Sequence, residues 1–176
     1  TLILVLAGIC SLAAQERLAM PIGDIASTLR SLANARGHLA DFAGVEQALQ
    51  RALALWRELG QPSGVADCLN DLGVLFVVGG RYDEAEAALR EAARIYTDLG
   101  QYLGVAYTWN NLGELEVRRG RYPVAQLYLQ RSLELKRAAG EAWAAAHTLN
   151  HLAEARLRQG DIAGARAHAE EALATA

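Results

Sequence analysis

Apolar residues recur along the chain with a helical period, and the whole pattern repeats every 40 residues. In one period Val105, Trp109 and Leu112 follow one another at steps of four and three, which predicts an amphipathic helix over 102–118. A glycine ends this stretch, and a second helical stretch follows over 122–139. The same division in every period predicts nine helices, at about 2–19, 24–38, 41–59, 62–78, 82–99, 102–118, 122–139, 141–158 and 162–175.

Three kinds of residue keep the 40-residue step. They are asparagines, leucines two positions later, and turn glycines: Asn70, Asn110, Asn150, Leu72, Leu112, Leu152, Gly80, Gly120 and Gly160. A fixed period of this size is typical of repeat proteins, in which each antiparallel helix pair buries its apolar face against the next. The pattern therefore predicts an all-α fold and a single repeat domain over 1–176, with a partial repeat and four further repeats at 1–21, about 22–60, 61–100, 101–140 and 141–176.

Composition narrows the functional classes. The formal net charge is −3 with both signs interspersed, so we expect no direct contact with nucleic acid. Cys10 and Cys68 lie in apolar stretches without a CxxC spacing, which favours free thiols in a reducing, cytoplasmic compartment.

The apolar opening over 1–14 has no basic region before it and is shorter than the roughly 20 residues of a membrane span, so no membrane association is expected. Because residue 1 is threonine, we expect a fragment of a longer protein that begins inside a truncated repeat.

A spaced motif recurs in the units and is clearest in the third. The pattern W-x2-L-G-x2-Y followed by A-x3-F is matched there, with Glu and Leu in place of Tyr and Phe, by Trp109, Leu112, Gly113, Glu116, Ala125 and Leu129. In this respect the chain resembles the tetratricopeptide repeat (TPR) family. The resemblance implies a right-handed superhelical solenoid of antiparallel helix pairs, whose first helices line a concave groove that binds a protein or peptide.

The period departs from that of the family. It is 40 residues here, where the usual period is 34, and the family's terminal proline is missing. This long form is similar to the repeats of animal polarity adaptors and of bacterial signal-responsive transcriptional regulators, and the Ala-, Arg- and Leu-rich composition is closer to the bacterial group. The resemblance thus implies the sensory domain of a cytoplasmic regulator.

The groove implied by the resemblance carries a row of polar side chains. A stripe at i, i+3, i+7 and i+11 of each first helix predicts the groove residues Asn70, Tyr107, Asn110, Glu114, Arg118, His147, Asn150, Glu154 and Arg158. An amide donates and accepts at once, so the asparagines could pair with the backbone of an extended ligand. The alternative is that they bond to adjacent helices and serve only the stacking of the repeats.

The charged and apolar members of this stripe are also open to two interpretations. Arg118 and Arg158 would bind a ligand carboxylate, but each also follows a glutamate by four positions and can satisfy it on the helix surface. In the second unit Val74, Phe76 and Val78 make the helix end apolar, which predicts burial or an apolar end of the groove.

Catalytic and metal chemistry have little support. His147, His151 and Glu154 share a helical face at a spacing that can support zinc, but the residue after His147 is Thr148 instead of the glutamate of HExxH. No glycine-rich phosphate loop and no nucleophile–base set is evident. We therefore expect no enzyme, metal or cofactor. The leading hypothesis is a protein- or peptide-binding module, and the alternative is a structural scaffold whose exposed ends meet in a homodimer.

Overall fold

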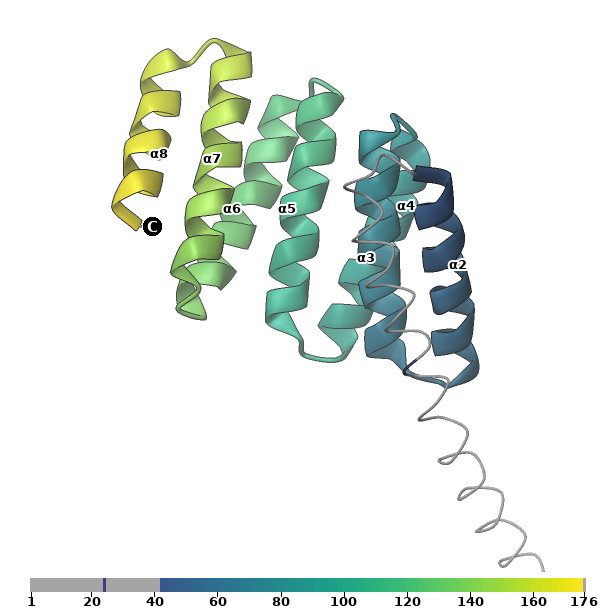
Figure 1. Ribbon diagram of the computed structural model, residues 1–176. Helices are drawn as coiled ribbons and strands as arrows, with labels where there is room; N and C mark the ends of the chain where they lie inside the picture. The colour runs from purple at the N-terminus through teal and green to yellow at the C-terminus, as the bar shows by residue number, and fades with distance from the viewer. Residues whose placement is uncertain (1–23, 25–41, 176) are drawn as a thin grey trace, which may run out of the picture. The chain divides into compact units, whose positions relative to one another are not determined.

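The computed structural model describes Asp24 and residues 42–175, and every regular element in this part of the chain is an α-helix. The described residues form seven helices, which are labelled in Figure 1: α2 (Phe42–Glu58), α3 (Pro62–Val78), α4 (Tyr82–Asp98), α5 (Tyr102–Arg118), α6 (Tyr122–Ala138), α7 (Ala142–Gln159) and α8 (Ile162–Thr175). The predicted all-helical fold is confirmed for these residues, and the bounds agree with the predicted ones to within one residue. The number of helices is seven instead of nine, because the two expected at about 2–19 and 24–38 fall, apart from Asp24, outside the described residues.

Glycines end the helices through a left-handed backbone conformation. Gly120, with φ of 75°, donates its N–H to the Val117 carbonyl at 3.0 Å, and the next N–H, of Arg121, reaches the Glu116 carbonyl at 2.9 Å. This Schellman arrangement needs a positive φ, which glycine adopts without a Cβ penalty. The same pair of bonds closes the chain at Gly60, Gly80, Gly100, Gly120, Gly140 and Gly160. These glycines recur every 20 residues, so each one ends a single helix and two helices make up the 40-residue period.

The chain divides into two compact units between Cys68 and Leu69. In the first unit, α2 buries an apolar stripe at helical spacing: Val45, Ala48, Leu49, Ala52 and Leu53. In the second unit each of the helices α4 to α8 packs on the next, and α5 also contacts α7. The first helices of the third and fourth repeats therefore lie side by side, with α6 packed against both (Figure 1).

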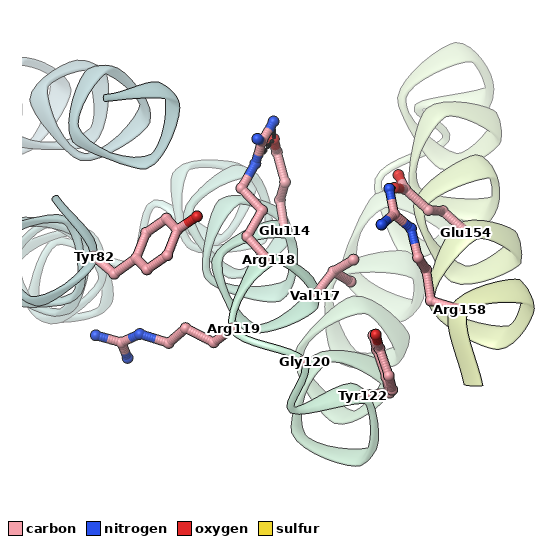
Figure 2. A pocket seen from close by; sticks show the side chains of 9 residues that line it. All are labelled: Tyr82, Glu114, Val117, Arg118, Arg119, Gly120, Tyr122, Glu154 and Arg158. Carbon is pink, nitrogen blue, oxygen red and sulfur yellow. Dashed lines mark hydrogen bonds and ion pairs between the residues drawn. The ribbon is translucent and has the colours of Figure 1, made fainter. Parts of the chain in front are cut away.

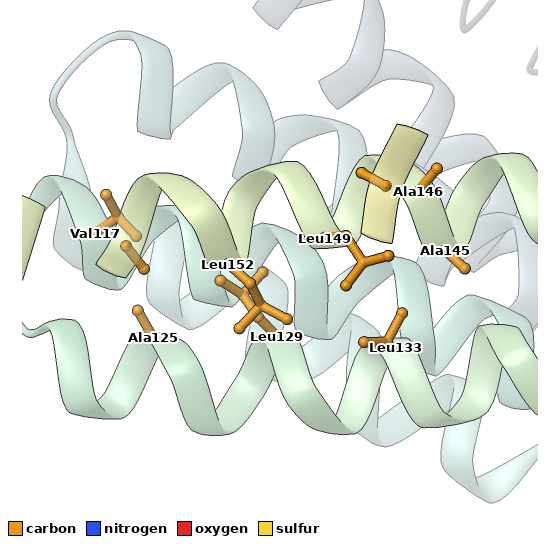
Figure 3. Packing of buried hydrophobic residues seen from close by; sticks show 10 residues of the cluster. Val117, Ala125, Leu129, Leu133, Ala145, Ala146, Leu149 and Leu152 are labelled. Atoms are coloured by element: carbon orange, nitrogen blue, oxygen red, sulfur yellow. The ribbon is translucent and has the colours of Figure 1, made fainter. Parts of the chain in front are cut away.

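A hydrophobic core joins α5 to α8 and fixes this arrangement. Leu129 and Leu133 on α6 meet Leu149 and Leu152 on α7 (Figure 3). Alanines fill the spaces between them and allow close approach of the helices: Ala125, Ala145, Ala146, Ala155 and Ala172. Each fully buried leucine contributes roughly 1.5–3 kcal/mol. The core thus holds α5 and α7, which carry most of the predicted groove residues, in a defined position.

Candidate functional site

The first asparagine of the 40-residue series joins two repeats. Asn70 on α3 accepts a hydrogen bond from Asn111 Nδ2 at 2.9 Å and from Thr108 Oγ1 at 3.2 Å, both on α5. The two partners lie 38 and 41 positions after Asn70, which places them three residues apart on one face of α5. We call this arrangement an asparagine clasp: an asparagine held by a threonine and, three residues later, by a second polar side chain of the next repeat.

Asn110 forms the same clasp with the fourth repeat. Its Oδ1 lies 3.0 Å from Thr148 Oγ1, and its Nδ2 lies 3.5 Å from His151 Nδ1. Asn110 is only 4% exposed, so its amide is committed to the contact between α5 and α7. Asn150, by contrast, is exposed and makes no side-chain hydrogen bond to any residue that the structure describes. The geometry therefore favours the stacking interpretation for Asn70 and Asn110, and leaves Asn150 open.

A buried lysine supports the second clasp. Lys136, the only lysine of the chain, is 1% exposed and donates from Nζ to Thr148 Oγ1 at 2.7 Å. Its ammonium lies 4.7 Å from the ring centroid of Tyr107, a predicted groove residue that is itself exposed. Desolvation lowers the pKa of Lys136 to about 8, and desolvation is also the main cause that lowers the pKa of His151. A neutral His151 can accept a hydrogen bond from the clasp amide.

Exposed aromatic rings cover the beginning of α7. His147, another predicted groove residue, lies between Trp143, at 6.0 Å between ring centroids, and His151, at 4.6 Å. Trp143 and His147 are both exposed. Within the described residues, no group of three or more His, Cys, Asp or Glu side chains is placed to hold a metal ion.

A pocket of about 480 Å³ lies over the last turns of α5 and α7 (Figure 2). Its lining consists of Tyr82, Glu114, Val117, Arg118, Arg119, Gly120, Tyr122, Glu154 and Arg158. Four of these were predicted as groove residues: Glu114, Arg118, Glu154 and Arg158. The pocket therefore brings together the charged half of the predicted stripe, from two successive repeats.

Two arginine–glutamate pairs face this pocket. Arg118 donates through Nε and Nη2 to Glu114 Oε1, at 3.1 and 2.8 Å, and Arg158 donates through Nη2 to Glu154 Oε1 at 3.2 Å. Both are solvent-exposed ion pairs between residues four positions apart on one helix. Such a pair stabilises a helix by only a few tenths of a kcal/mol. Of the five N–H donors of a guanidinium, Arg118 uses two in its pair and Arg158 uses one. Both arginines can therefore turn to a ligand carboxylate at small cost.

The other lining residues were not predicted. Arg119 bonds to Glu86 at 2.5 Å and to Asp83 at 2.6 Å, and Figure 2 shows its guanidinium directed away from the other charged groups. Its bond to Glu86 is the largest cause that lowers the pKa of that carboxyl. Tyr82 and Tyr122 begin α4 and α6 and form part of the wall. Their own 40-residue step, after the turn glycines, was the signal that could have identified them.

The apolar end of α3, in the second repeat, is partly buried and partly exposed, so neither burial nor an apolar end of the groove describes it fully. Phe76 and Val77 are buried, whereas Val74 and Val78 are exposed. None of the four lines the pocket. No helix among the described residues combines the length and apolar character that crossing a bilayer requires.

Comparison with known proteins identifies the repeat. The family model described as tetratricopeptide repeat matches residues 24–98, 79–138 and 104–176. No curated protein matches the chain. Among solved structures, the crystal structure of BtubC (BKLC) from P. vanneervenii matches with a TM-score of 0.75 and 22% identity, over 85% of this chain and 62% of that one. At this identity the likeness concerns the fold alone, and the chain spans less than two thirds of that structure's length.

Proposed function

Because the chain belongs to the tetratricopeptide repeat family, whose members generally mediate protein–protein interaction, we propose that it binds an extended, carboxylate-bearing segment of a partner protein in the pocket over α5 and α7. One observation carries the proposal: the same glutamate–arginine pair occurs twice, one repeat apart, and both copies face one pocket. Fold alone does not assign this function, so the chemistry of the pocket has to support it.

The spacing of the two arginines suggests the form of the ligand. Helices in contact have axes 8–10 Å apart, so equivalent positions on α5 and α7 are separated by about that distance. A polyproline II segment rises about 3.1 Å per residue with three residues per turn, so side chains three positions apart are about 9 Å apart on one face. An extended segment with carboxylates at positions i and i+3, or with one acidic side chain and a terminal carboxylate, matches the arrangement of Arg118 and Arg158.

The remaining predicted groove residues divide into two groups. Tyr107, His147 and Asn150 are exposed on the same two helices, and we infer that they contact longer ligands. Asn70 and Asn110 are held in clasps, so the proposed ligand contacts do not include them. A sensory role in a cytoplasmic transcriptional regulator stays a prediction that rests on the resemblance alone.

The experiment replaces the pocket arginines and measures binding of a defined peptide set. The set contains eight-residue peptides with two glutamates spaced by three positions, each with a free or an amidated C-terminus, and fluorescence anisotropy reports binding. The double variant Arg118→Glu with Arg158→Glu should weaken binding of the best peptide by at least about tenfold, because two charge-assisted contacts are lost. The control is Arg166→Glu, which breaks a comparable exposed pair with Glu170 on α8, away from the pocket.

Equal weakening by the control would mean that only the overall charge matters. Binding that survives the double variant unchanged, or no binding by any acidic peptide of the set, would refute the pocket as a carboxylate site. A circular dichroism melt of each variant separates these outcomes from a loss of folding.

A further inference from the structure

Aromatic side chains are exposed on the first halves of α5 and α7, at positions that the 40-residue step makes equivalent. Trp143 is 74% exposed and stacks on the exposed ring of His147, and Tyr107, 40 positions before His147, is 43% exposed. Tyr107 is exposed although α7 packs beside α5, so this position stays open when a further repeat is stacked on it. Exposed tryptophan and tyrosine rings that gather on one surface are typical of an interaction site.

These rings form one surface across the two helices. Lys136 Nζ lies 4.7 Å from the Tyr107 ring centroid and 2.7 Å from the Oγ1 of Thr148, the residue that follows His147. The Tyr107 ring on α5 is therefore next to the part of α7 that carries His147. We call Tyr107, Trp143 and His147 the aromatic platform.

The buried ammonium determines which kind of side chain the platform accepts. Aromatic surfaces often bind cations through the faces of their rings. Here Lys136, which is 1% exposed, already lies over the Tyr107 ring, so a ligand cation would approach a like charge that solvent screens poorly. A neutral aromatic or branched aliphatic side chain meets no such repulsion and gains by burial against the rings.

The platform and the charged pocket share one stripe of each helix. His147 precedes Arg158 by 11 positions, and Tyr107 precedes Arg118 by 11, so each pair lies on nearly the same side of its helix and about 17 Å apart along the axis. Trp143 is one turn further, at about 22 Å. An extended chain advances about 3.1–3.4 Å per residue, so about five to seven residues span these distances. A segment held by the arginines can therefore reach the platform.

We propose that the aromatic platform is a second subsite for the partner segment that the pocket holds, and that it binds a neutral aromatic or branched aliphatic side chain about five to seven residues from the acidic pair of that segment. This inference rests on the proposed function, because the pocket has to anchor the same segment. It defines the recognised segment as acidic at one end and apolar at the other. Trp143, which the predicted stripe did not include, then determines specificity.

The test compares labelled peptides that share two glutamates spaced by three positions, with binding followed by fluorescence anisotropy. Phenylalanine, lysine or alanine stands six positions before the first glutamate or six positions after the second. A further pair of peptides carries the phenylalanine only two positions away. At least one peptide with phenylalanine at six positions should bind about tenfold more tightly than its alanine version. Lysine at that place, or phenylalanine at two positions, should improve binding by less than about twofold.

Variants of the chain locate the contact. Trp143→Ala with His147→Ala should reduce the gain from phenylalanine to less than about twofold and leave the affinity for the alanine peptide unchanged. Both side chains are exposed, so a circular dichroism melt should be unaffected. The matched control is Leu127→Ala, which removes an apolar side chain that is 54% exposed on α6 and should keep the full gain.

The outcomes distinguish a failure of the platform from a failure of the pocket. Arginine-dependent binding that phenylalanine does not strengthen, or a gain that survives the loss of Trp143 and His147, would overturn the platform and leave the pocket. Equal gains from lysine and phenylalanine would also overturn it, because the site would then accept cations. Absence of binding by every peptide would refute both. Self-association of the chain that Trp143→Ala abolishes would overturn the platform, because its occupant would then be a second copy.

Discussion

The clasp asparagines allow one residue type to be tested in two environments within the same chain. Asn110 and Asn150 hold equivalent positions on α5 and α7, but Asn110 is buried and bonded to the next repeat, whereas Asn150 is exposed. If the asparagines serve stacking, Asn110→Ala should destabilise the fold and Asn150→Ala should not. If they serve only a ligand, neither change should affect stability.

The expected loss of stability in Asn110→Ala follows from the contacts that the Asn110 side chain makes. The bond to Thr148 Oγ1 at 3.0 Å is a net contribution of about 1 kcal/mol, and the contact with His151 at 3.5 Å is at the limit of hydrogen bonding. The Thr148 hydroxyl keeps two other partners, the Ala144 carbonyl at 3.1 Å and Lys136 Nζ at 2.7 Å, so the substitution does not leave it unpaired. We therefore expect Asn110→Ala to cost about 1–2 kcal/mol, and Asn150→Ala to change the free energy of unfolding by less than about 0.5 kcal/mol.

Urea denaturation followed by circular dichroism measures both variants against the parent. Because repeat arrays open partly by unit, hydrogen exchange at the α5 and α7 amides should accompany it, with faster exchange in Asn110→Ala confined to these helices. In thermal melts the same loss of stability corresponds to a melting temperature lower by roughly 2–8 °C for a chain of this size. Equal destabilisation by both substitutions, or none by either, would contradict the stacking role assigned to the clasp.

Two further substitutions test the packing between the helices. Gly113→Ala places a Cβ 2.5 Å from Leu129 Cγ, so it should lower the free energy of unfolding by about 1–3 kcal/mol. In a double-mutant cycle measured by urea denaturation, Leu129→Ala should offset part of that cost. Costs of the two substitutions that simply add would argue against a steric cause. For Lys136, desolvation lowers the pKa from 10.5 to about 8 on folding, so between these values the unfolded chain binds more protons than the folded one. The free energy of unfolding should therefore rise by up to about 3 kcal/mol as the pH increases from 8 to 10.5, and Lys136→Met should remove this increment and stabilise the protein at pH 7. A parent and a Lys136→Met variant with the same pH dependence in urea denaturation would show that the lysine is not the cause.

The helices could be predicted from the sequence because two strong local signals coincide. Glycine at a position of positive φ ends each helix, and apolar residues at steps of three and four begin again after it. These signals are local, so they require no knowledge of which helix packs on which. The family motif added little to the helix bounds, since its aromatic position holds Glu116 here.

The departure at that position could not be understood from the sequence. Glu116 is 2% exposed and bonds to Arg121, which lies across the turn at the beginning of the next helix. The equivalent pairs of the neighbouring repeats use a cation–π contact and an ion pair of reversed polarity: Phe76 with Arg81, and Arg156 with Asp161. The side chain at the position of Glu116 therefore differs between repeats, but in each repeat it pairs with the residue five positions later. This pairing is seen only in the structure.

The candidate site was predictable in part. Helical periodicity placed Glu114 and Arg118 on one face, and the 40-residue step placed their counterparts beside them, which is how the charged half of the pocket was found. The same periodicity does not indicate whether a face meets solvent or another helix. It therefore grouped Asn110 with the groove residues, although this side chain is directed into the next repeat.

Side-chain volumes at the repeat interfaces are matched in pairs, which explains where the small residues of the motif vary. A Cβ on Gly73 or Gly113 would lie 2.5 Å from the leucine that faces it on the following helix, Leu89 or Leu129. In the fourth repeat both members of the pair are alanines, at Ala153 and Ala169. A glycine is required only where the facing residue is large, so a sequence motif that specifies glycine alone describes half of the constraint.

The same rule accounts for the position of the single lysine. Gly104 faces the ring of Tyr96 so closely that a Cβ at this position would lie 2.5 Å from the ring, and the equivalent residues one repeat later are Ala144 and Lys136. The lysine stem is thinner than a tyrosine ring, so it leaves room for the alanine methyl group, and it carries its ammonium past the helix to Thr148. A change that relaxes the steric requirement at this interface thereby introduces a buried charge next to the clasp. The contact between the third and fourth repeats should consequently gain stability as the pH rises from 8 to 10.5, whereas the equivalent contact before it has no lysine in this place.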